Sequence, residues 1–208
     1  MADSPDRLRV GAAGKAYVAP VGTVAPVGIN TYTAGSPGTF EAIQWGTAYK
    51  DLGLISEDGL TEELDEDREE WKPWGYLAPV RTQITSETTT FNFTCWETNA
   101  HVLSLRYRLP IGDMDSAANN TEVHFDQVQR TSPDLRAFGF DIFDGTVSGA
   151  PEGGNHMRFI VPRGEVTERG EVTNKADEVI GYEFTVTAYP GSDGVAIKRM
   201  YKAGISLT

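Results

Sequence analysis

The chain has 208 residues, of which 39% are hydrophobic and 23% charged, the composition of a globular protein that can bury its own core. Eighteen basic against thirty acidic residues give a formal net charge of −12, which argues against a protein that wraps nucleic acid. No apolar run approaches the roughly 18 residues of a membrane helix. The polar N-terminus does not resemble a secretory signal, and the single cysteine excludes an intramolecular disulfide, so we expect folding in a reducing cytoplasm.

The N-terminal part, residues 10–38, is dominated by glycine, alanine, proline, valine and threonine. We expect a short strand at 15–18 and then a long ordered loop or arm, because prolines interrupt both helices and strand ladders. Alternation of apolar and polar side chains predicts a strand at 39–45, and a short apolar stretch predicts another at 50–55.

An acidic run follows at 57–70, where nine carboxylates accompany one arginine. A run of like charge cannot be buried, so it forms a solvated face, a mobile loop or one half of a charge-matched interface. Trp71, Trp74 and Tyr76 come directly after it, and large aromatic side chains of this kind anchor a segment either to its own domain or to a neighbouring subunit. The residues alone leave both anchors open. We interpret 47–80 as one long loop, acidic and rich in tryptophan.

Most of the remaining chain alternates apolar and polar side chains with the period of two that half-buried antiparallel strands require. Turns with glycine or proline separate several of these segments, which are rich in β-branched and aromatic residues. The predicted strands lie at 88–96, 122–128, 136–143, 156–162 and 179–189.

One segment, 98–108, departs from this pattern and predicts a helix. Its apolar residues Ala100, Leu103 and Tyr107 fall at helical spacing, and Asn99 or the threonine before it can cap the start. We therefore predict a mainly β fold, an antiparallel β-sandwich or barrel with one flanking α-helix, as a single domain over residues 1–208.

The residue types that carry catalysis or bind metals show no recognisable arrangement. His101, His124 and His156 lack the spacing of a zinc site, and no acidic cluster has the order of a calcium loop. Cys95 alternates with phenylalanines and is expected to be a buried apolar residue. The chain has neither a nucleophile elbow nor a phosphate-binding loop. We predict no enzymatic activity and no cofactor, which favours a structural or binding role.

Three stretches carry a resemblance. The first is Gly-Lys-Ala-Tyr-Val-Ala-Pro-Val-Gly-Thr at 14–23. The second is Leu-Gly-Leu-Ile-Ser-Glu-Asp-Gly-Leu at 52–60, with the acidic and tryptophan-rich run and the strand 84–96 behind it. The third is Phe-Ile-Val-Pro-Arg-Gly-Glu-Val-Thr-Glu-Arg-Gly-Glu-Val at 159–172, followed by the strand 182–190. In these stretches the chain resembles the major tail (tail tube) proteins of bacteriophages with long non-contractile tails (siphophages), particularly those that infect actinobacteria.

The resemblance implies a fold, an assembly and partners. Such proteins share a β-sandwich or barrel with a flanking helix, related to the tubes of contractile tails and of type VI secretion. They form hexameric rings that stack into a tube whose inner barrel is continuous between subunits, and the tube is the conduit for DNA ejection. The implied partners are further copies of the chain, the tape measure protein, the tail terminator and the distal tail or tip proteins. DNA is contacted only in passage, no membrane is involved, and the protein is assembled in the host cytoplasm into the virion tail.

The resemblance and the alternation of the strands together indicate candidate contact residues. The long loop is expected to contact neighbouring subunits, with candidates Trp71, Trp74, Tyr76, Glu62, Glu63 and Asp65. A mixed-charge stretch suits contacts between stacked rings, unless its residues are only solvated turn residues: Arg163, Glu165, Glu168, Arg169 and Glu171. The polar side of the last long strand is a candidate for the lumen or the outer surface: Glu183, Thr185 and Thr187.

Three alternatives remain. A β-sandwich binding or adhesion module would use the aromatic cluster to recognise a receptor or a carbohydrate. A small hydrolase would use a pair of carboxylates. A neck or baseplate protein of the same fold would form one ring and stop. Open-ended polymerisation distinguishes a tube protein from all three.

Overall fold

The structure is a computed structural model that describes residues 10–29, 45–110, 125–144 and 155–202. Within these stretches the chain is mainly β, with one short helix, as predicted. In chain order the elements are β1 (Ala13–Pro20), β2 (Lys50–Asp51), β3 (Ile55–Trp71), β4 (Arg81–Cys95), α1 (Ala100–Tyr107), β5 (Leu135–Asp144), β6 (Asn155–Arg169), β7 (Tyr182–Ala188) and β8 (Lys198–Lys202).

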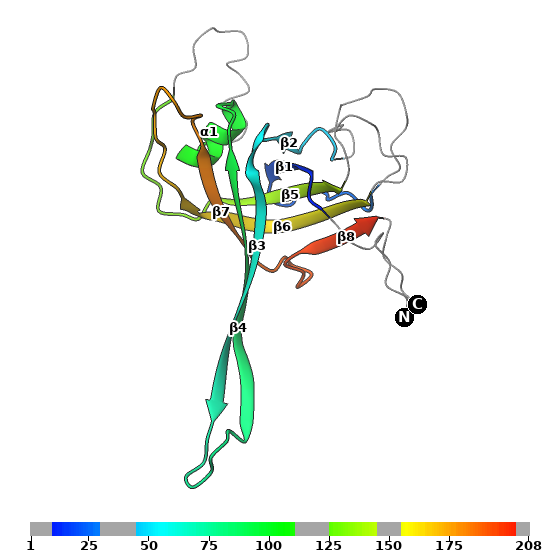
Figure 1. Cartoon of the computed structure of the whole chain (residues 1–208), viewed down its shortest axis with the longest axis vertical. Helices are drawn as coiled ribbons and strands as arrows, with labels where there is room; N and C mark the ends of the chain where they lie inside the picture. The colour runs from blue at the N-terminus through cyan, green and yellow to red at the C-terminus, as the bar shows by residue number, and fades with distance from the viewer. Residues whose placement is uncertain (1–9, 30–44, 111–124, 145–154, 203–208) are drawn as a thin grey trace.

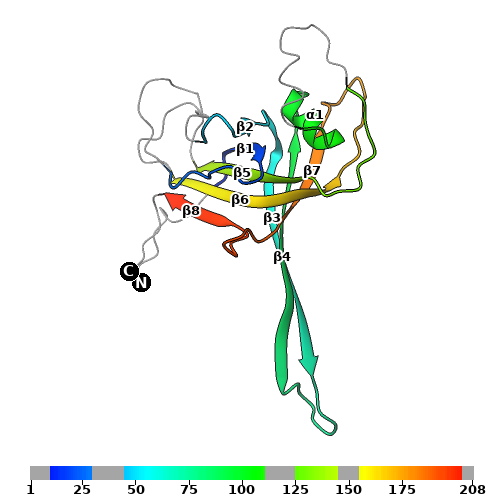
Figure 2. The ribbon, with the colours of Figure 1, turned by 180° about the vertical axis from the view of Figure 1, so that it is seen from behind.

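All of the strand pairs are antiparallel, in the order β2-β1-β5-β6-β7-β4-β3, and β8 pairs with β6 beside this path. The first and last strands of this order lie next to each other. The short connection between β2 and β3 forms hydrogen bonds to β1 on one side and to the residue that follows β4 on the other. The Leu52 amide donates to the Ala16 carbonyl and the Trp96 amide to the Leu54 carbonyl, each at 2.9 Å. The sheet therefore curls on itself, and β5 and β6 run across the direction of β3, β4 and β7 (Figures 1 and 2).

The main core fills the inside of this curled sheet. In β4, Phe91, Phe93 and Cys95 are buried on one side, as their alternation predicts. The Phe91 ring lies 5.0 Å from that of Phe140 and 6.0 Å from that of Phe159, measured between centroids. Such offset and tilted ring pairs add to the free energy of apolar burial.

A second apolar cluster covers the outer face of β1, β5 and β6, where Trp45 stacks on Tyr17 and Tyr49 packs against Trp45. Gly139 makes this close packing feasible, because a Cβ atom there would lie 2.2 Å from the Trp45 ring. These three strands are thus buried on both faces where the two clusters cover them.

The helix begins where predicted. The Asn99 side-chain oxygen accepts hydrogen bonds from the His101 and Val102 amides, both at 3.0 Å, and caps the start. Val102 and Leu105 are fully buried, whereas Ala100, Leu103 and Tyr107, which predicted the helix by their spacing, are partly buried. The apolar residues of this short helix surround most of its axis, and the sheet selects which of them are buried.

Several predicted strands have other boundaries in the structure or are absent from its described part. The strand expected at 15–18 is confirmed within β1, residues 21–29 form no strand, and 30–38 lie outside the described residues. Of the expected strand 39–45, only Trp45 is described, and it is not in a strand. The strand predicted at 122–128 is wrong for 125–128, which have no regular structure, while 122–124 lie outside the described residues.

Candidate assembly surface

The β3–β4 hairpin continues far beyond the body of the molecule as a two-stranded ribbon (Figures 1 and 2). We call residues 62–88 the arm. The prediction of a long loop at 47–80 is wrong for most of its length, because the acidic run belongs to strand β3, which pairs with β4 from Leu60–Phe93 to Trp71–Arg81. Charge repulsion argued against burial, and the side chains are indeed solvated, but it did not prevent strand pairing.

The arm lacks the burial that normally stabilises a hairpin. All side chains from Thr61 to Glu87 are exposed, on both faces of the ribbon. Eight acidic side chains of the arm accompany three basic ones. Glu62 pairs with Arg199 of β8 at the base of the arm, so this predicted inter-subunit residue is engaged within its own chain. A two-stranded ribbon without a hydrophobic face is marginally stable in water, so the arm is suited to binding a partner.

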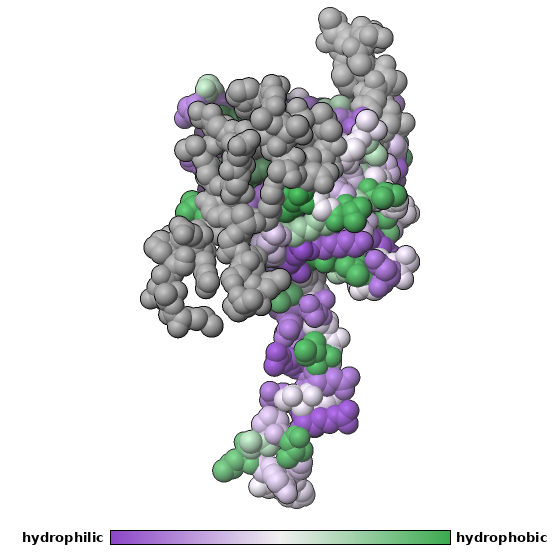
Figure 3. All heavy atoms as spheres, turned by 90° about the vertical axis from the view of Figure 1, so that its right-hand side faces the viewer, coloured by the Kyte–Doolittle hydropathy of each residue, from purple (hydrophilic) through white to green (hydrophobic). Residues whose placement is uncertain are grey.

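The end of the arm carries an exposed apolar cluster, which we call the tip and define as residues 71–81. Its apolar side chains show as a hydrophobic patch beyond the hydrophilic ribbon in Figure 3. Trp74 is 104% exposed, Leu77 97% and Tyr76 61%. Trp71 is covered in part by the Arg81 guanidinium, 5.4 Å from the centre of its ring. These aromatic residues do not pack on the core of their own chain. Of the two alternatives, an anchor to the same domain is therefore wrong.

Over β7, β4 and β3, one face of the sheet is polar, and it continues from the body onto the arm. The register of β7, β4 and β3 places Thr185, Asn92 and Thr61 in one row and Thr187, Thr90 and Glu63 in the next. We call this the polar face. As far as the pair Asp67–Ser86 on the arm, it consists only of threonine, serine, asparagine and carboxylates: Glu183, Thr185, Thr187, Thr94, Asn92, Thr90, Thr88, Ser86, Thr61, Glu63, Asp65 and Asp67.

The three residues predicted to face a lumen all lie on the polar face, but they differ in exposure. Glu183 is exposed and Thr185 half-buried. Thr187 is only 7% exposed, because its hydroxyl lies 2.8 Å from that of Thr167 on β6. Sequence reasoning missed the larger part of the face on β4 and β3. The alternation in β4 was visible, but its alignment with β7 was not.

Four of the predicted ring-stacking residues lie in strand β6 and are therefore not turn residues: Arg163, Glu165, Glu168 and Arg169. Glu171 follows the strand in a segment without regular structure. Arg169 ties the sheet to the helix, since its side chain donates to the carbonyls of Leu105, at 3.0 Å, and Val166, at 2.8 Å. Burial, followed by the nearby Arg108 charge, lowers the pKa of Arg169 to about 10. Arg163, Glu168 and Glu171 are exposed, and Glu165 is half-buried.

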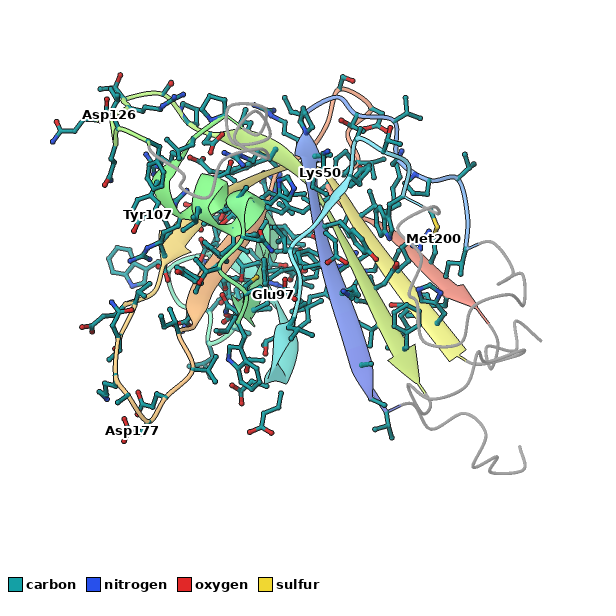
Figure 4. All side chains as sticks on the ribbon, turned by 90° about the horizontal axis from the view of Figure 1, so that it is seen from above. Lys50, Glu97, Tyr107, Asp126, Asp177 and Met200 are labelled. Atoms are coloured by element: carbon teal, nitrogen blue, oxygen red, sulfur yellow. The ribbon has the colours of Figure 1, made fainter. Side chains whose placement is uncertain are left out.

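A pocket of about 410 Å³ lies at the end of the body away from the arm, lined by Glu168, Arg169, Gly170, Glu183 and Thr185. Its place follows from the register, because Glu183 pairs with Thr94 of β4, and the opposite end of β4 belongs to the arm. Figure 4 shows this end of the molecule from above, where Asp177 labels the connection between β6 and β7. The exposed side chains of the lining are the two carboxylates.

A buried charge cluster holds the segments before β2 against the outer face of the sheet. Arg158 donates to both carboxylate oxygens of Asp141, at 2.6 and 2.8 Å, and the Trp45 indole donates to Asp141 at 2.6 Å. Arg158 also donates to the Gly28 carbonyl, at 3.3 Å. Burial acts to raise the pKa of Asp141, but hydrogen bonds from His156 and Arg158 hold it below its usual range. The cluster is enclosed by its own partners and serves the fold.

Among the described residues, no group of three or more histidine, cysteine or acidic side chains could hold a metal ion. Cys95 is buried, and burial raises the pKa of its thiol to about 12. His156 belongs to the buried cluster, His101 lies on α1, and His124 is outside the described residues.

The comparison with protein families decides the identity. The sequence model of the family described as phage tail tube protein matches residues 1–201, nearly the whole chain. The chain belongs to the phage tail tube protein family. No curated protein matches it. The predicted resemblance to tail tube proteins is thereby confirmed.

Family membership assigns this tail tube protein a structural role in the virion tail and implies self-assembly into a tube. It favours such a role over catalysis. In the described part of the chain, no helix has the length and apolar character needed to cross a bilayer. The arm, its tip and the polar face are therefore the features through which assembly can be understood.

Proposed function

We propose that six copies of this tail tube protein form a ring, that rings stack into a hollow tube, and that the polar face lines its lumen. The observation that carries the proposal is the unbroken run of hydroxyl, amide and carboxylate side chains over β7, β4 and β3, which continues onto the arm. A sheet face of this length without an apolar contact has no use in packing, but it suits a wall in contact with water.

The chemistry of the polar face suits passage of DNA. Proteins bind the DNA backbone mainly by neutralising phosphates with lysine and arginine. The described part of this face in β7, β4 and β3 has neither until Arg81 at the tip. Its exposed carboxylates, among them Glu63, Asp65 and Glu183, repel phosphate at any sequence of bases. DNA then slides along the wall without being held.

The edge of the sheet supports lateral assembly. β3 is the last strand of the described sheet and pairs only with β4 along its 17 residues. An unpaired edge of this length favours association with other chains, and a closed ring removes it. The exposed stacking candidates Arg163, Glu168 and Glu171 then contact the next ring.

The finer biological setting follows from the resemblance. We propose that the tube belongs to a siphophage of an actinobacterial host and is assembled in the host cytoplasm. Before ejection the lumen holds the tape measure protein, and the terminator and the distal tail or tip proteins close the two ends.

Electron microscopy of the purified protein in negative stain, beside size-exclusion chromatography, tests the proposal. We expect hollow tubes of uniform width and variable length. A population of single closed rings would indicate a neck or baseplate protein instead. A monomer that is retained on a carbohydrate column would indicate the binding module.

The assignment of the lumen needs a matched pair of variants. Asp65→Lys with Asp67→Lys places cations on the polar face, whereas Glu66→Lys with Glu70→Lys places the same charges on the opposite face of the arm. Tubes of the first variant should retain fluorescent duplex DNA, and tubes of the second should retain less. Equal retention by both variants would contradict a lumenal polar face.

A further inference from the structure

We infer that the end of the polar face away from the arm is a docking surface for a polypeptide whose apolar side chains are flanked by lysine or arginine. The surface combines Leu54 and Trp96, which we call the apolar pair, with the carboxylates of the pocket. The inference rests on the proposed lumenal position of the polar face. It adds the chemistry by which the wall would hold the polypeptide that fills the lumen before DNA passes.

The first argument is the position of the apolar pair. The Trp96 amide donates to the Leu54 carbonyl at 2.9 Å, so the two residues lie opposite each other, one step beyond the pair Ile55–Cys95. Cys95 is buried in the main core, and Ile55 packs against that core. Because side chains alternate along a strand, Leu54 and Trp96 lie on the other side of the sheet, which is that of the polar face. The last polar row is therefore followed by two apolar side chains.

The second argument is that the fold holds both side chains in an exposed position. Leu54 is 60% exposed and Trp96 38%. The Leu54 amide donates to the Glu97 carboxylate at 2.8 Å, which fixes the connection before β3 (Figure 4). Beside the Trp96 ring lies Gly181, where even a Cβ atom would come within 3.9 Å of the indole. The neighbouring strand thus leaves the ring uncovered, and an apolar pair kept exposed in this way indicates an interaction site.

The third argument is the charge beside the apolar pair. Glu183 pairs with Thr94, so it lies diagonally across from Trp96, at roughly 7–8 Å along the sheet. Glu183 also lines the pocket of about 410 Å³, whose exposed charged side chains are Glu183 and Glu168. Arg169 is bonded to carbonyl groups of its own chain. A lysine or arginine side chain is attracted by the carboxylates and by the face of the indole, whereas phosphate is repelled, so the occupant is a polypeptide and not DNA.

The repetition of the surface suits an occupant that is held and later released. One apolar pair and two carboxylates form a contact far smaller than a stable interface, so each contact is weak. In the proposed tube every copy presents the same surface, and one long polypeptide can engage many of them at once. Its overall affinity is high while it spans the tube and falls as the contacts are lost one after another.

Fluorescence anisotropy with two designed peptides tests the inference on the unassembled protein, in which the surface is exposed. The probe is a labelled amphipathic helix with leucine on one face and lysine on both flanks, and its matched control has glutamate at every lysine position. We expect the lysine peptide to bind at least about tenfold more tightly, because it pairs opposite charges and the control pairs like charges. Equal binding of the two peptides, or binding of neither, overturns the inference.

Two variants of the surface separate its apolar and acidic parts. Trp96→Thr should weaken binding of the lysine peptide by at least about fivefold, because a central aromatic side chain carries much of the affinity of a contact. Glu168→Gln with Glu183→Gln should abolish the preference for lysine over glutamate. The matched control Trp74→Thr removes an exposed indole at the tip and should leave binding unchanged.

Thermal unfolding of each variant serves as the folding control. The glutamine variant alters exposed side chains only, so it tests the inference even if Trp96→Thr fails to fold. An undiminished preference for lysine in the glutamine variant overturns the inference. Failure of the wild type to form tubes would instead contradict the proposed function, and the peptide result on the unassembled protein stands apart from it.

Photo-cross-linking in complete tails identifies the occupant. A photoreactive phenylalanine replaces Leu54, and the matched control places it at Val24, which is 86% exposed in the segment after β1. We expect position 54 alone to give adducts with a polypeptide other than this chain, at a segment where lysine or arginine flanks apolar residues. Adducts with a second copy of this chain or with DNA, the same adducts from both positions, or no adduct would each overturn the inference.

Discussion

The body and the arm share the strands β3 and β4, yet different forces hold each of them. In the body, Phe91, Phe93 and Cys95 of β4 alternate with half-buried polar residues and fill the core. In the arm, the same strand is exposed from Arg81 to Glu87, and its partner strand is acidic. The comparison teaches that β3 and β4 stay hydrogen-bonded to each other well beyond the point where their side chains are buried. The buried apolar clusters lie in the body, whereas the side chains of the arm from Thr61 to Glu87 are all exposed.

The largest expected loss of stability comes from a core substitution in β4, and a substitution on the arm part of the same strand is its control. Phe91→Ala removes a fully buried ring from the main core and should cost about 3–5 kcal/mol of unfolding free energy. Ile84→Ala, on the arm, removes a side chain that is 50% exposed and should change stability by less than about 0.5 kcal/mol. Chemical denaturation of the unassembled protein measures both values. A similar loss in the two variants would contradict the contrast between body and arm.

Breaking the buried ion pair between Arg158 and Asp141 should lower the free energy of unfolding by nearly as much. Arg158→Met leaves the buried Asp141 carboxylate without its guanidinium partner, and breaking a buried ion pair in this way typically costs about 3–5 kcal/mol. Because the folded-state pKa of Asp141 is lowered, the pair stabilises the wild type above the unfolded pKa of about 3.9, and this stabilisation is lost as the pH falls. The stability gap between wild type and variant should narrow below about pH 4. A gap that is constant with pH would argue against a charged Asp141.

An intermediate effect is expected at the tip, and on assembly alone. Trp74→Ala should raise the concentration needed for tubes by at least about tenfold, because a central aromatic contributes about 2 kcal/mol or more to an interface. The melting temperature of the monomer should not change, since Trp74 is fully exposed. Sedimentation gives the first quantity and calorimetry the second. Equal losses in assembly and in melting temperature would show that the tip belongs to its own domain.

The smallest effect concerns the charge of the arm. Glu66 and Glu87 lie directly opposite each other, and like charges in this position destabilise a ribbon by up to about 1 kcal/mol. Glu87→Gln should slow hydrogen exchange of the arm amides in the monomer by up to about fivefold and leave the body unchanged. Thr85→Val is a control without a charge change. Slower exchange throughout the body would mean that arm and body unfold together.

Local patterns predicted much of the fold. The alternation in β4 and β5, the cap at Asn99 and the strand at 15–18 needed only the spacing of apolar and polar residues. The acidic run was correctly expected to be solvated, but its strand was missed because its side chains do not alternate. β8 was not predicted either, since three of its five residues are basic and its pairing with β6 depends on a distant segment.

The sequence by itself determined that this protein is mainly β, that its acidic run stays in water and, through the resemblance, that it belongs to the tail. Only the tertiary structure decided that the run is one strand of an arm, that Trp71, Trp74 and Tyr76 lie at its end, and that Thr187 is covered. The physical reason is that burial and register depend on which strands meet. The pairing of β4 with both β3 and β7 joins segments about a hundred residues apart, and it alone creates the polar face and sets the tip opposite the pocket.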